Sequence, residues 1–203
     1  MQNTPIKLAT LATLLIGPTA LADYPATVLA SNPLAYYRFE EAPGATTLVD
    51  SSGNGLDIDN SFPAGTTVLG SDGAVGSAVT FNGDGYLVSP LGLDTSIGDF
   101  TIEAIIKRTA GVPEGVVIAN QDGNLGPGRS NLVVNGAGFI TTFSGGATTN
   151  SGVINTGESF DHIILTFDQS AVAEGVDPTF RFFINGAEAG TGTAIPEAAN
   201  GSW

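Results

Sequence analysis

AYYRFEEAPGATTLVDSSGNGLDID, residues 35–59, is the stretch that decides the fold class of this chain. Its first residues alternate and are rich in aromatic side chains, which predicts a first β-strand over residues 35–40. A Pro43-Gly44 break follows, and a turn crowded with Asp, Ser, Asn and Gly comes after it. Aromatic strand, break and polar turn together favour an antiparallel β-protein.

The polar turn at residues 50–57 carries oxygen-bearing side chains at alternate positions, as the opening of a calcium loop does. A twelve-residue loop of that class would end on a bidentate Glu, but its twelfth position here is Ser61. The alternative is an Asx-type turn in which Asp50 caps backbone N–H groups and Asn54-Gly55 adopts positive φ. The sequence therefore predicts either a structural turn or a calcium site whose ligands are Asp50, Ser52, Asn54 and Asp57.

The composition of the 203-residue chain indicates one all-β domain. Hydrophobic residues make up 42% of it, which is enough to build a core, and the 28 Gly and 11 Pro fall between short apolar runs. The 20 Asp and Glu against 6 Lys and Arg give a net charge of -14, which repels nucleic-acid phosphates and anionic lipid heads. We therefore predict no nucleic-acid partner; the carboxylates either keep the domain soluble or bind cations.

The first 22 residues predict export. Lys7 precedes the apolar run LATLATLLIG at residues 8–17, and Ala20-Leu21-Ala22 matches an A-x-A cleavage signal, so we expect cleavage before Asp23. No later stretch is long and apolar enough to span a bilayer of about 30 Å, so no membrane insertion is expected after cleavage. The chain has no Cys and must hold its exported fold without disulfides. These features predict a secreted or cell-surface protein with a signal peptide at 1–22, a lead-in segment at 23–34 and one domain at 35–203.

Short apolar runs separated by Gly, Asn and Asp turns predict many further strands. The expected strands cover residues 78–82, 86–89, 100–107, 115–120, 130–134, 138–144, 160–168, 180–184 and 187–190. Around the hairpin turn at 82–85, alternation places Phe81 and Leu87 in the core. A single helical turn at 26–30, stopped by Asn32-Pro33, is expected to lead into the sheet.

The loop QDGNLGPGR at residues 121–129 is the predicted ligand-binding segment. Its polar residues Asp122, Asn124 and Arg129 lie between two strands, and loops at the rim of a β-sandwich are where ligands are usually met. The alternative is a solvated polar loop without a ligand.

Catalysis is not supported by the pattern of reactive residues. No strand carries the spaced carboxylates that glycoside hydrolysis needs, because Glu103 stands alone on its strand. His162 is the single histidine and is expected to be a hydrogen-bonded structural residue. With no Cys and no nucleophile elbow, we predict no catalytic residues.

Several motifs occur in one order along the chain: AYYRFEE, LVDSSGNG, GSAVTFNGDGYLVSP, DFTIEAIIK, FDHIILTFD and FRFFINGAE. In that order they resemble the laminin-G-like jelly-roll domains of bacterial secreted proteins, within the concanavalin A-like lectin/glucanase superfamily. The resemblance implies an all-β, two-sheet antiparallel jelly-roll sandwich. That family normally adds a closing strand pair with an aspartate-rich signature, which does not appear before Trp203. We therefore expect the jelly roll to lack its last strands and the chain to be C-terminally incomplete.

The superfamily that the chain resembles contains both enzymes and binding modules, so the fold leaves the function open. The lack of paired carboxylates favours an exported, non-catalytic recognition or adhesion module that binds a glycan or an extracellular protein, with calcium as a candidate cofactor. Two alternatives are an accessory domain of a polysaccharide-degrading enzyme and a structural spacer of a large cell-surface protein.

Overall fold

The computed structural model describes residues 23–60, 67–82, 85–91, 99–108, 115–119, 131–134, 139–144, 147–154, 159–168 and 179–193. The expected signal peptide and the predicted ligand residues Asp122, Asn124 and Arg129 lie outside these ranges, as do residues 194–203. Among the helical residues that the structure describes, no stretch is long and apolar enough to cross a membrane.

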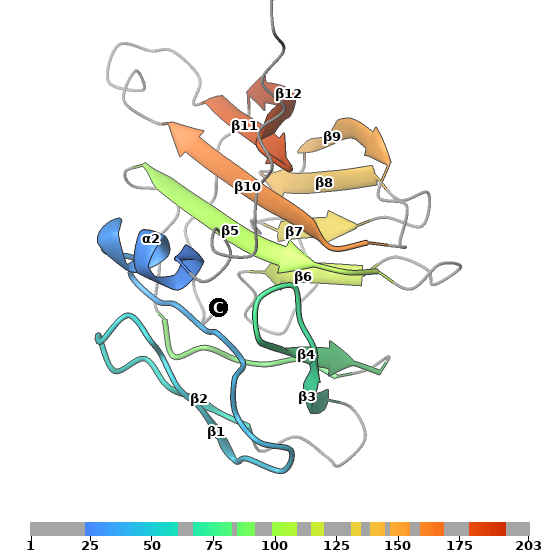
Figure 1. The fold of residues 1–203 in the computed structure, drawn as a ribbon. Coiled ribbons are helices and arrows are strands. Elements are labelled where there is room, and N and C mark those ends of the chain that lie inside the picture. The colour runs from blue at the N-terminus through green and yellow to red at the C-terminus, as the bar shows by residue number, and fades with distance from the viewer. Residues whose placement is uncertain are drawn as a thin grey trace, which may run out of the picture.

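Strands dominate the described part of the chain (Figure 1). A short helix, α2, spans Tyr24–Ala30. The strands are β1 (Thr47–Leu48), β2 (Ile58–Asp59), β3 (Thr67–Asp72), β4 (Ser77–Phe81), β5 (Phe100–Ile106), β6 (Gly115–Ala119), β7 (Asn131–Val134), β8 (Phe139–Ser144), β9 (Ala147–Ile154), β10 (Asp161–Asp168), β11 (Thr179–Ile184) and β12 (Ala187–Thr193). All strand pairs are antiparallel, in the orders β1-β2, β3-β4, β12-β11-β10-β5 and β6-β7-β8-β9. The predicted all-β class is confirmed.

The sheet β12-β11-β10-β5 builds the main core because its strands alternate between buried and half-exposed side chains. Its buried residues come from β10 and β11: Ile163, Leu165, Phe167, Phe180 and Phe182. Neighbouring residues in a strand point to opposite faces. The sheet therefore has one face in the core and an outer face that carries His162, Ile164 and Thr166 of β10.

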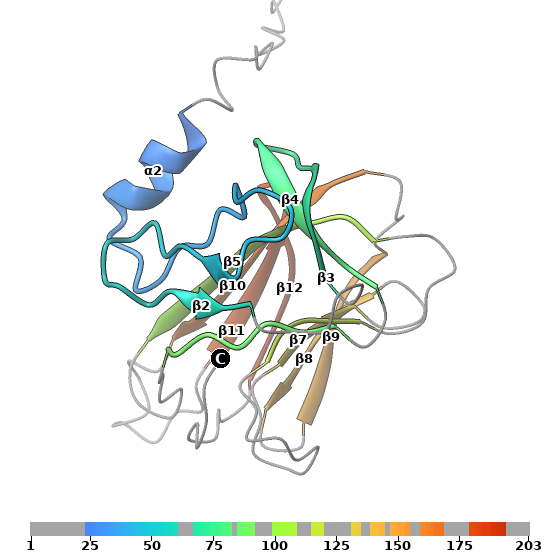
Figure 2. The same ribbon diagram turned by 90° about the horizontal axis from the view of Figure 1, so that it is seen from below.

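The second four-stranded sheet, β6-β7-β8-β9, supplies the other layer of the sandwich (Figures 1 and 2). The two sheets meet where β12 lies beside β9. Helix α2 lies away from the second sheet in both views, and the hydroxyl of its Tyr24 donates to Glu103 of β5. The outer face of the first sheet thus borders α2 and does not border the second sheet.

The N-terminal part of the chain forms a smaller core of its own. Leu48 of β1, Ile58 of β2 and Leu69 of β3 are buried together, and the half-buried Tyr37 and Leu87 pack against them. The expected inward position of Leu87 agrees with this packing. The expected position of Phe81 is wrong, because its side chain is 47% exposed at the end of β4.

The predicted strand at residues 35–40 is also wrong. The structure has only an isolated bridge there, between Tyr37 and Asp50. The physical reasons are local: the N–H of Tyr36 donates to the Asp50 side chain (2.9 Å), and Phe39 takes a φ of 55°, which ends an extended path. The expected helical turn is confirmed, although α2 begins two residues earlier, at Tyr24.

Candidate functional site

The carboxylate of Asp50 is buried and fully used by hydrogen bonds within the protein. Its Oδ1 accepts from the N–H groups of Tyr36 and Ser52, both at 2.9 Å. Its Oδ2 accepts from the Ser52 hydroxyl at 2.7 Å and from the N–H of Leu56 at 3.1 Å. A carboxylate has about four lone-pair sites, so these donors occupy its whole capacity.

The other predicted metal ligands lie in the same turn and are also hydrogen-bonded. The Oδ1 of Asp57 accepts from the N–H of Asp50 (2.8 Å), and the Ser52 hydroxyl accepts from the N–H of Asn54 (3.2 Å). The Asn54 side-chain amide donates to the carbonyls of Pro33 (3.2 Å) and Leu34 (3.0 Å), which ties the turn to the lead-in segment. The structure therefore brings the predicted residues together as a network of donors and acceptors.

The backbone of the turn differs in one detail from the expected Asx-type turn. Positive φ occurs at Gly53 (90°) and Gly55 (73°). Asn54, expected to share positive φ with Gly55, is not among the residues with positive φ in the described part of the chain. The two glycines allow the chain to fold tightly around Asp50 without steric strain.

The hydrogen bonds also decide the charge state of Asp50. Burial alone would raise its pKa, but the donors from Tyr36, Ser52 and Leu56 outweigh burial and hold the pKa below its ordinary value. A cation at Asp50 would have to displace these donors. Within the described residues there is also no group of three or more His, Cys, Asp or Glu side chains that could hold a metal. Calcium binding at this turn stays a prediction.

A second polar cluster lies on the outer face of the first sheet and joins three elements. Oε1 of Glu103 (β5) accepts from the Tyr24 hydroxyl of α2 at 2.7 Å and lies 2.6 Å from Nε2 of His162 (β10). The rings of Tyr24 and His162 meet edge to face, with centroids 5.9 Å apart. We call Tyr24, Glu103 and His162 the clasp. The expectation that His162 is hydrogen-bonded is confirmed, but nothing in the sequence patterns indicated its partners.

The clasp is partly open to solvent. The side chains of His162 and Glu103 are 31% and 33% exposed. Burial of Tyr24, followed by its hydrogen bond to Glu103, raises the pKa of the Tyr24 phenol well above its ordinary value. The phenol therefore stays protonated and keeps donating to Glu103 across the neutral range.

Helix α2 touches the sheet along one side. Tyr24 and Val28 are half-buried, and Ser31 follows at the spacing i, i+4, i+7, which places the three on one helical face. No residue of α2 is fully buried, and Leu29 on another side is 40% exposed. Because so little apolar surface is buried, the clasp is a substantial part of what positions the helix.

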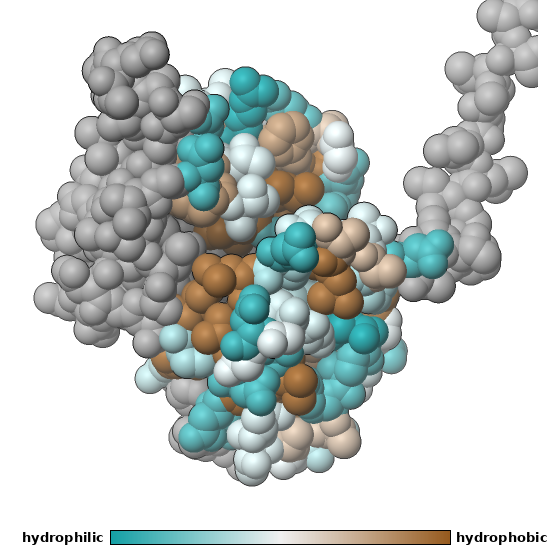
Figure 3. All heavy atoms as spheres, turned by 90° about the vertical axis from the view of Figure 1, so that its left-hand side faces the viewer, coloured by the Kyte–Doolittle hydropathy of each residue, from teal (hydrophilic) through white to brown (hydrophobic). Residues whose placement is uncertain are grey.

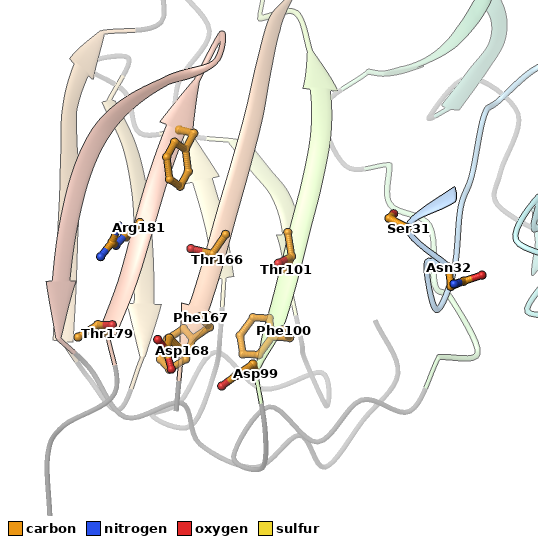
Figure 4. A pocket seen from close by; sticks show the side chains of 11 residues that line it. Ser31, Asn32, Asp99, Phe100, Thr101, Thr166, Phe167, Asp168, Thr179 and Arg181 are labelled. Atoms are coloured by element: carbon orange, nitrogen blue, oxygen red, sulfur yellow. The ribbon is translucent and has the colours of Figure 1, made fainter. Parts of the chain in front are cut away.

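An open pocket of about 810 Å³ lies where the C-terminal end of α2 faces the outer face of the sheet (Figure 4). Ser31 and Asn32 form one wall, and Thr101, Thr166 and Arg181 form the other, side by side on β5, β10 and β11. The register pairs Thr101 with Thr166 and Thr166 with Arg181, so the three side chains share one face. Seen from the α2 side, the surface is a mixture of polar residues and apolar patches (Figure 3).

Two carboxylates also line this pocket, Asp99 and Asp168. Phe100 pairs with Phe167, so continuing the register by one residue places Asp99 beside Asp168. Sequence reasoning missed this pair because the two residues lie on different strands, far apart in the chain. Both are exposed at the ends of their strands.

Similarity to a known family covers the sheet and does not cover the Asp50 turn. The family model described as the concanavalin A-like lectin/glucanases superfamily matches residues 81–203, more than half of the chain. Comparison with curated proteins and with solved structures finds no match. The matched residues include β5, β10 and β11, which carry the sheet wall of the pocket, whereas α2 and the Asp50 turn precede the matched range.

Proposed function

This chain belongs to the concanavalin A-like lectin/glucanase superfamily, and on that premise we propose that it is a non-catalytic recognition or adhesion module. Its ligand is a carbohydrate or an extracellular protein, and it acts after export, as the predicted signal peptide at 1–22 implies. The sandwich is the scaffold and the binding surface lies on it, because function in such folds resides in sites on the surface.

The single observation that carries this proposal is the pocket between α2 and the outer sheet face. Its volume of about 810 Å³ falls within the range of typical ligand pockets, about 300–1,000 Å³. Its lining combines hydroxyl, amide, guanidinium and carboxylate groups with phenylalanine rings. Polar groups arranged around an apolar surface suit a ligand with many hydroxyl groups.

A non-catalytic role is supported by where the described carboxylates lie. Glycoside hydrolysis needs two carboxyl groups, one of which is commonly held protonated in a sheltered site. The Glu103 carboxylate is hydrogen-bonded to Tyr24 and His162. The Asp50 carboxylate accepts hydrogen bonds from N–H and O–H donors. Asp99 and Asp168 are neighbours, but both are solvent-exposed and neither is sheltered as a general acid would be.

The test uses the protein secreted by cells that express the chain. N-terminal sequencing should find Asp23 as the first residue. An intact N-terminus on the secreted protein would contradict cleavage of the signal peptide, and retention of the chain inside the cells would contradict the export proposal. The secreted protein is then applied to a glycan array with calcium and with a chelator, and its ability to release reducing sugar from the bound glycans is measured. Binding without release is the expected result. No binding under either condition would overturn the carbohydrate proposal, and release of sugar would overturn the non-catalytic one.

A further inference from the structure

We propose that the Asn54-Gly55 pair is a site of spontaneous deamidation, and that this modification releases the lead-in segment from the Asp50 turn as the protein ages. The inference goes beyond the proposed function, because it concerns a covalent change in the chain and needs no ligand. Five Asn-Gly pairs occur in the sequence, and the structure describes both residues of two of them, Asn54-Gly55 and Asn185-Gly186. The difference between these two pairs is the basis of the proposal.

The reaction needs only the side-chain amide, the following backbone nitrogen and water. The N–H of Gly55 gives its proton to hydroxide, and its nitrogen forms a bond to Cγ of Asn54. The bond from Cγ to Nδ2 then breaks and ammonia leaves, so that a cyclic succinimide remains. Water opens this ring at either carbonyl and produces aspartate or isoaspartate. Glycine favours the ring closure because it has no side chain beside the attacking nitrogen.

The backbone at Asn54-Gly55 leaves room for this reaction. Both residues are exposed, so water and hydroxide reach them. Gly55 has a φ of 73°, and a Cβ placed on it would meet nothing within 4 Å. Among the residues that the structure describes, none accepts a hydrogen bond from the Gly55 N–H. Within that part of the chain, the attacking nitrogen therefore has no acceptor that would hold its proton.

Two hydrogen bonds hold the side-chain amide of Asn54. Its Nδ2 donates to the carbonyls of Pro33 at 3.2 Å and of Leu34 at 3.0 Å. Both bonds lie at the surface, where water competes for the same groups. Rotation of the side chain towards Gly55 breaks these two bonds and leaves the donors around the Asp50 carboxylate in place. The opening that the reaction needs is therefore local.

The second pair, Asn185-Gly186, is also exposed but is held by more bonds. The Oδ1 of Asn185 accepts from the N–H of His162 at 2.9 Å, and its Nδ2 donates to Oδ1 of Asp161 at 3.0 Å. The backbone N–H of Asn185 donates to the carbonyl of His162 at 2.8 Å. The pair forms the turn between the antiparallel strands β11 and β12. Rotation of the Asn185 side chain breaks bonds at both ends of its amide inside a paired hairpin, so the fold protects this pair.

Deamidation of Asn54 removes the tie between the turn and the lead-in segment. A carboxylate only accepts hydrogen bonds, so the product has no donor for the carbonyls of Pro33 and Leu34. Its negative charge faces those carbonyl oxygens and lies in the same turn as the carboxylates of Asp50 and Asp57. Isoaspartate also lengthens the main chain within the turn. Because the same segment carries α2, whose end forms one wall of the pocket, the modification loosens that wall as well.

The first test follows both pairs in one molecule. The mature protein is incubated at about pH 8, and peptide mapping by mass spectrometry measures aspartate and isoaspartate at each position over time. We expect Asn54 to react at least about tenfold faster than Asn185, as the additional hydrogen bonds at Asn185 imply. In guanidinium chloride the two rates should become similar, because the unfolded chain holds neither side chain in place. Equal rates in the folded protein, a faster reaction at Asn185, or a reaction of Asn54 only in guanidinium chloride would overturn the proposal.

The second test measures the consequence of the modification. Asn54→Asp carries one of the two products, and Asn54→Gln keeps a donor amide without the charge and closes a ring far more slowly. We expect hydrogen exchange at the amides of Asn32 and Tyr36 to be about five- to tenfold faster in Asn54→Asp than in the wild type, and unchanged in β10. Asn54→Gln should stay within about twofold of the wild type. Equal exchange in the wild type and Asn54→Asp would overturn the release of the lead-in segment.

Discussion

The Asp50 turn and the clasp both connect the lead-in segment to the β-structure, but they do so in opposite ways. Asp50 is 5% exposed and its carboxylate is filled by donors that lie close in sequence or just across the turn. Glu103 is one-third exposed, and its two partners come from distant parts of the chain. A filled, buried carboxylate stabilises a fold, whereas a partly open cluster beside a pocket can still change its contacts.

This difference indicates which of the two regions is the better candidate for a binding site. The turn was the most promising site in the sequence because its ligand chemistry is contiguous. In the structure, the Asp50 carboxylate accepts hydrogen bonds from the protein's own backbone N–H groups. The pocket has no contiguous motif, yet strand pairing and the docking of α2 bring its polar groups together. Substitutions in the turn and in the clasp can therefore separate a cluster that stabilises the fold from one that positions a helix.

Asp50→Ala should lower the free energy of unfolding by roughly 2–4 kcal/mol, because it leaves several part-buried N–H groups without an acceptor. Urea denaturation followed by circular dichroism measures the loss. The control is Asp59→Ala, which removes an exposed carboxylate from β2 and should change stability by less than about 0.5 kcal/mol. Equal losses for the two variants would show that the hydrogen-bond network around Asp50 is not what stabilises the turn.

The stability that Asp50 contributes should depend on pH in one direction. Its pKa is lower in the folded protein than its ordinary value of 3.8, so the folded state favours the ionised form. The contribution is therefore fully present above pH 3.8 and is lost as the pH falls through the folded pKa. Melting curves of the wild type and Asp50→Asn should differ most near pH 6 and converge towards pH 2. A gap that widens in acid would contradict this account.

Tyr24→Phe should loosen α2 while leaving the sandwich intact. It removes the hydroxyl that donates to Glu103 but keeps the ring against His162, a loss of about 0.5–1.5 kcal/mol for one hydrogen bond. Hydrogen exchange should become faster for the amides of residues 24–31 and stay unchanged in β10. Tyr86→Phe is the matched control, since it removes the same hydroxyl from a residue that is 61% exposed and lies outside the clasp. Weaker saccharide binding by Tyr24→Phe alone would tie the clasp to the pocket.

Calcium should have the smallest effect. Because four donors already occupy the Asp50 carboxylate, we expect 1 mM calcium to change the free energy of unfolding by less than about 0.5 kcal/mol. Thermal melts with calcium and with a chelator measure this. A larger rise that Asp50→Asn abolishes would instead support the calcium prediction and would mean that the ion displaces the N–H donors.

Contiguous features were predictable from the sequence. The Asp50 turn could be placed because its residues lie within one short segment, and the strands β5, β10 and β11 could be placed because each alternates over its full length. The order of the motifs was enough to identify the superfamily.

Features that depend on register or on an unusual backbone were not predictable. Tyr24, Glu103 and His162 meet only once α2 has docked and β5 has paired with β10. Residues 35–40 read as a strand because of their aromatic content, but the positive φ of Phe39 carries no signal in the sequence. Asp99 and Asp168 become neighbours only through strand pairing.

Gly192 of β12 lies at one end of a row of aromatic rings that reaches the pocket. A Cβ at Gly192 of β12 would stand 2.6 Å from Cζ of Phe180, so the ring leans directly on the backbone of the edge strand. From Phe180 the rings continue to Phe167 (6.1 Å between centroids) and on to Phe100 (5.0 Å), and the last two line the pocket. A side chain introduced at Gly192 would therefore have to displace the Phe180 ring, and that ring stacks on Phe167, one of the residues that line the pocket.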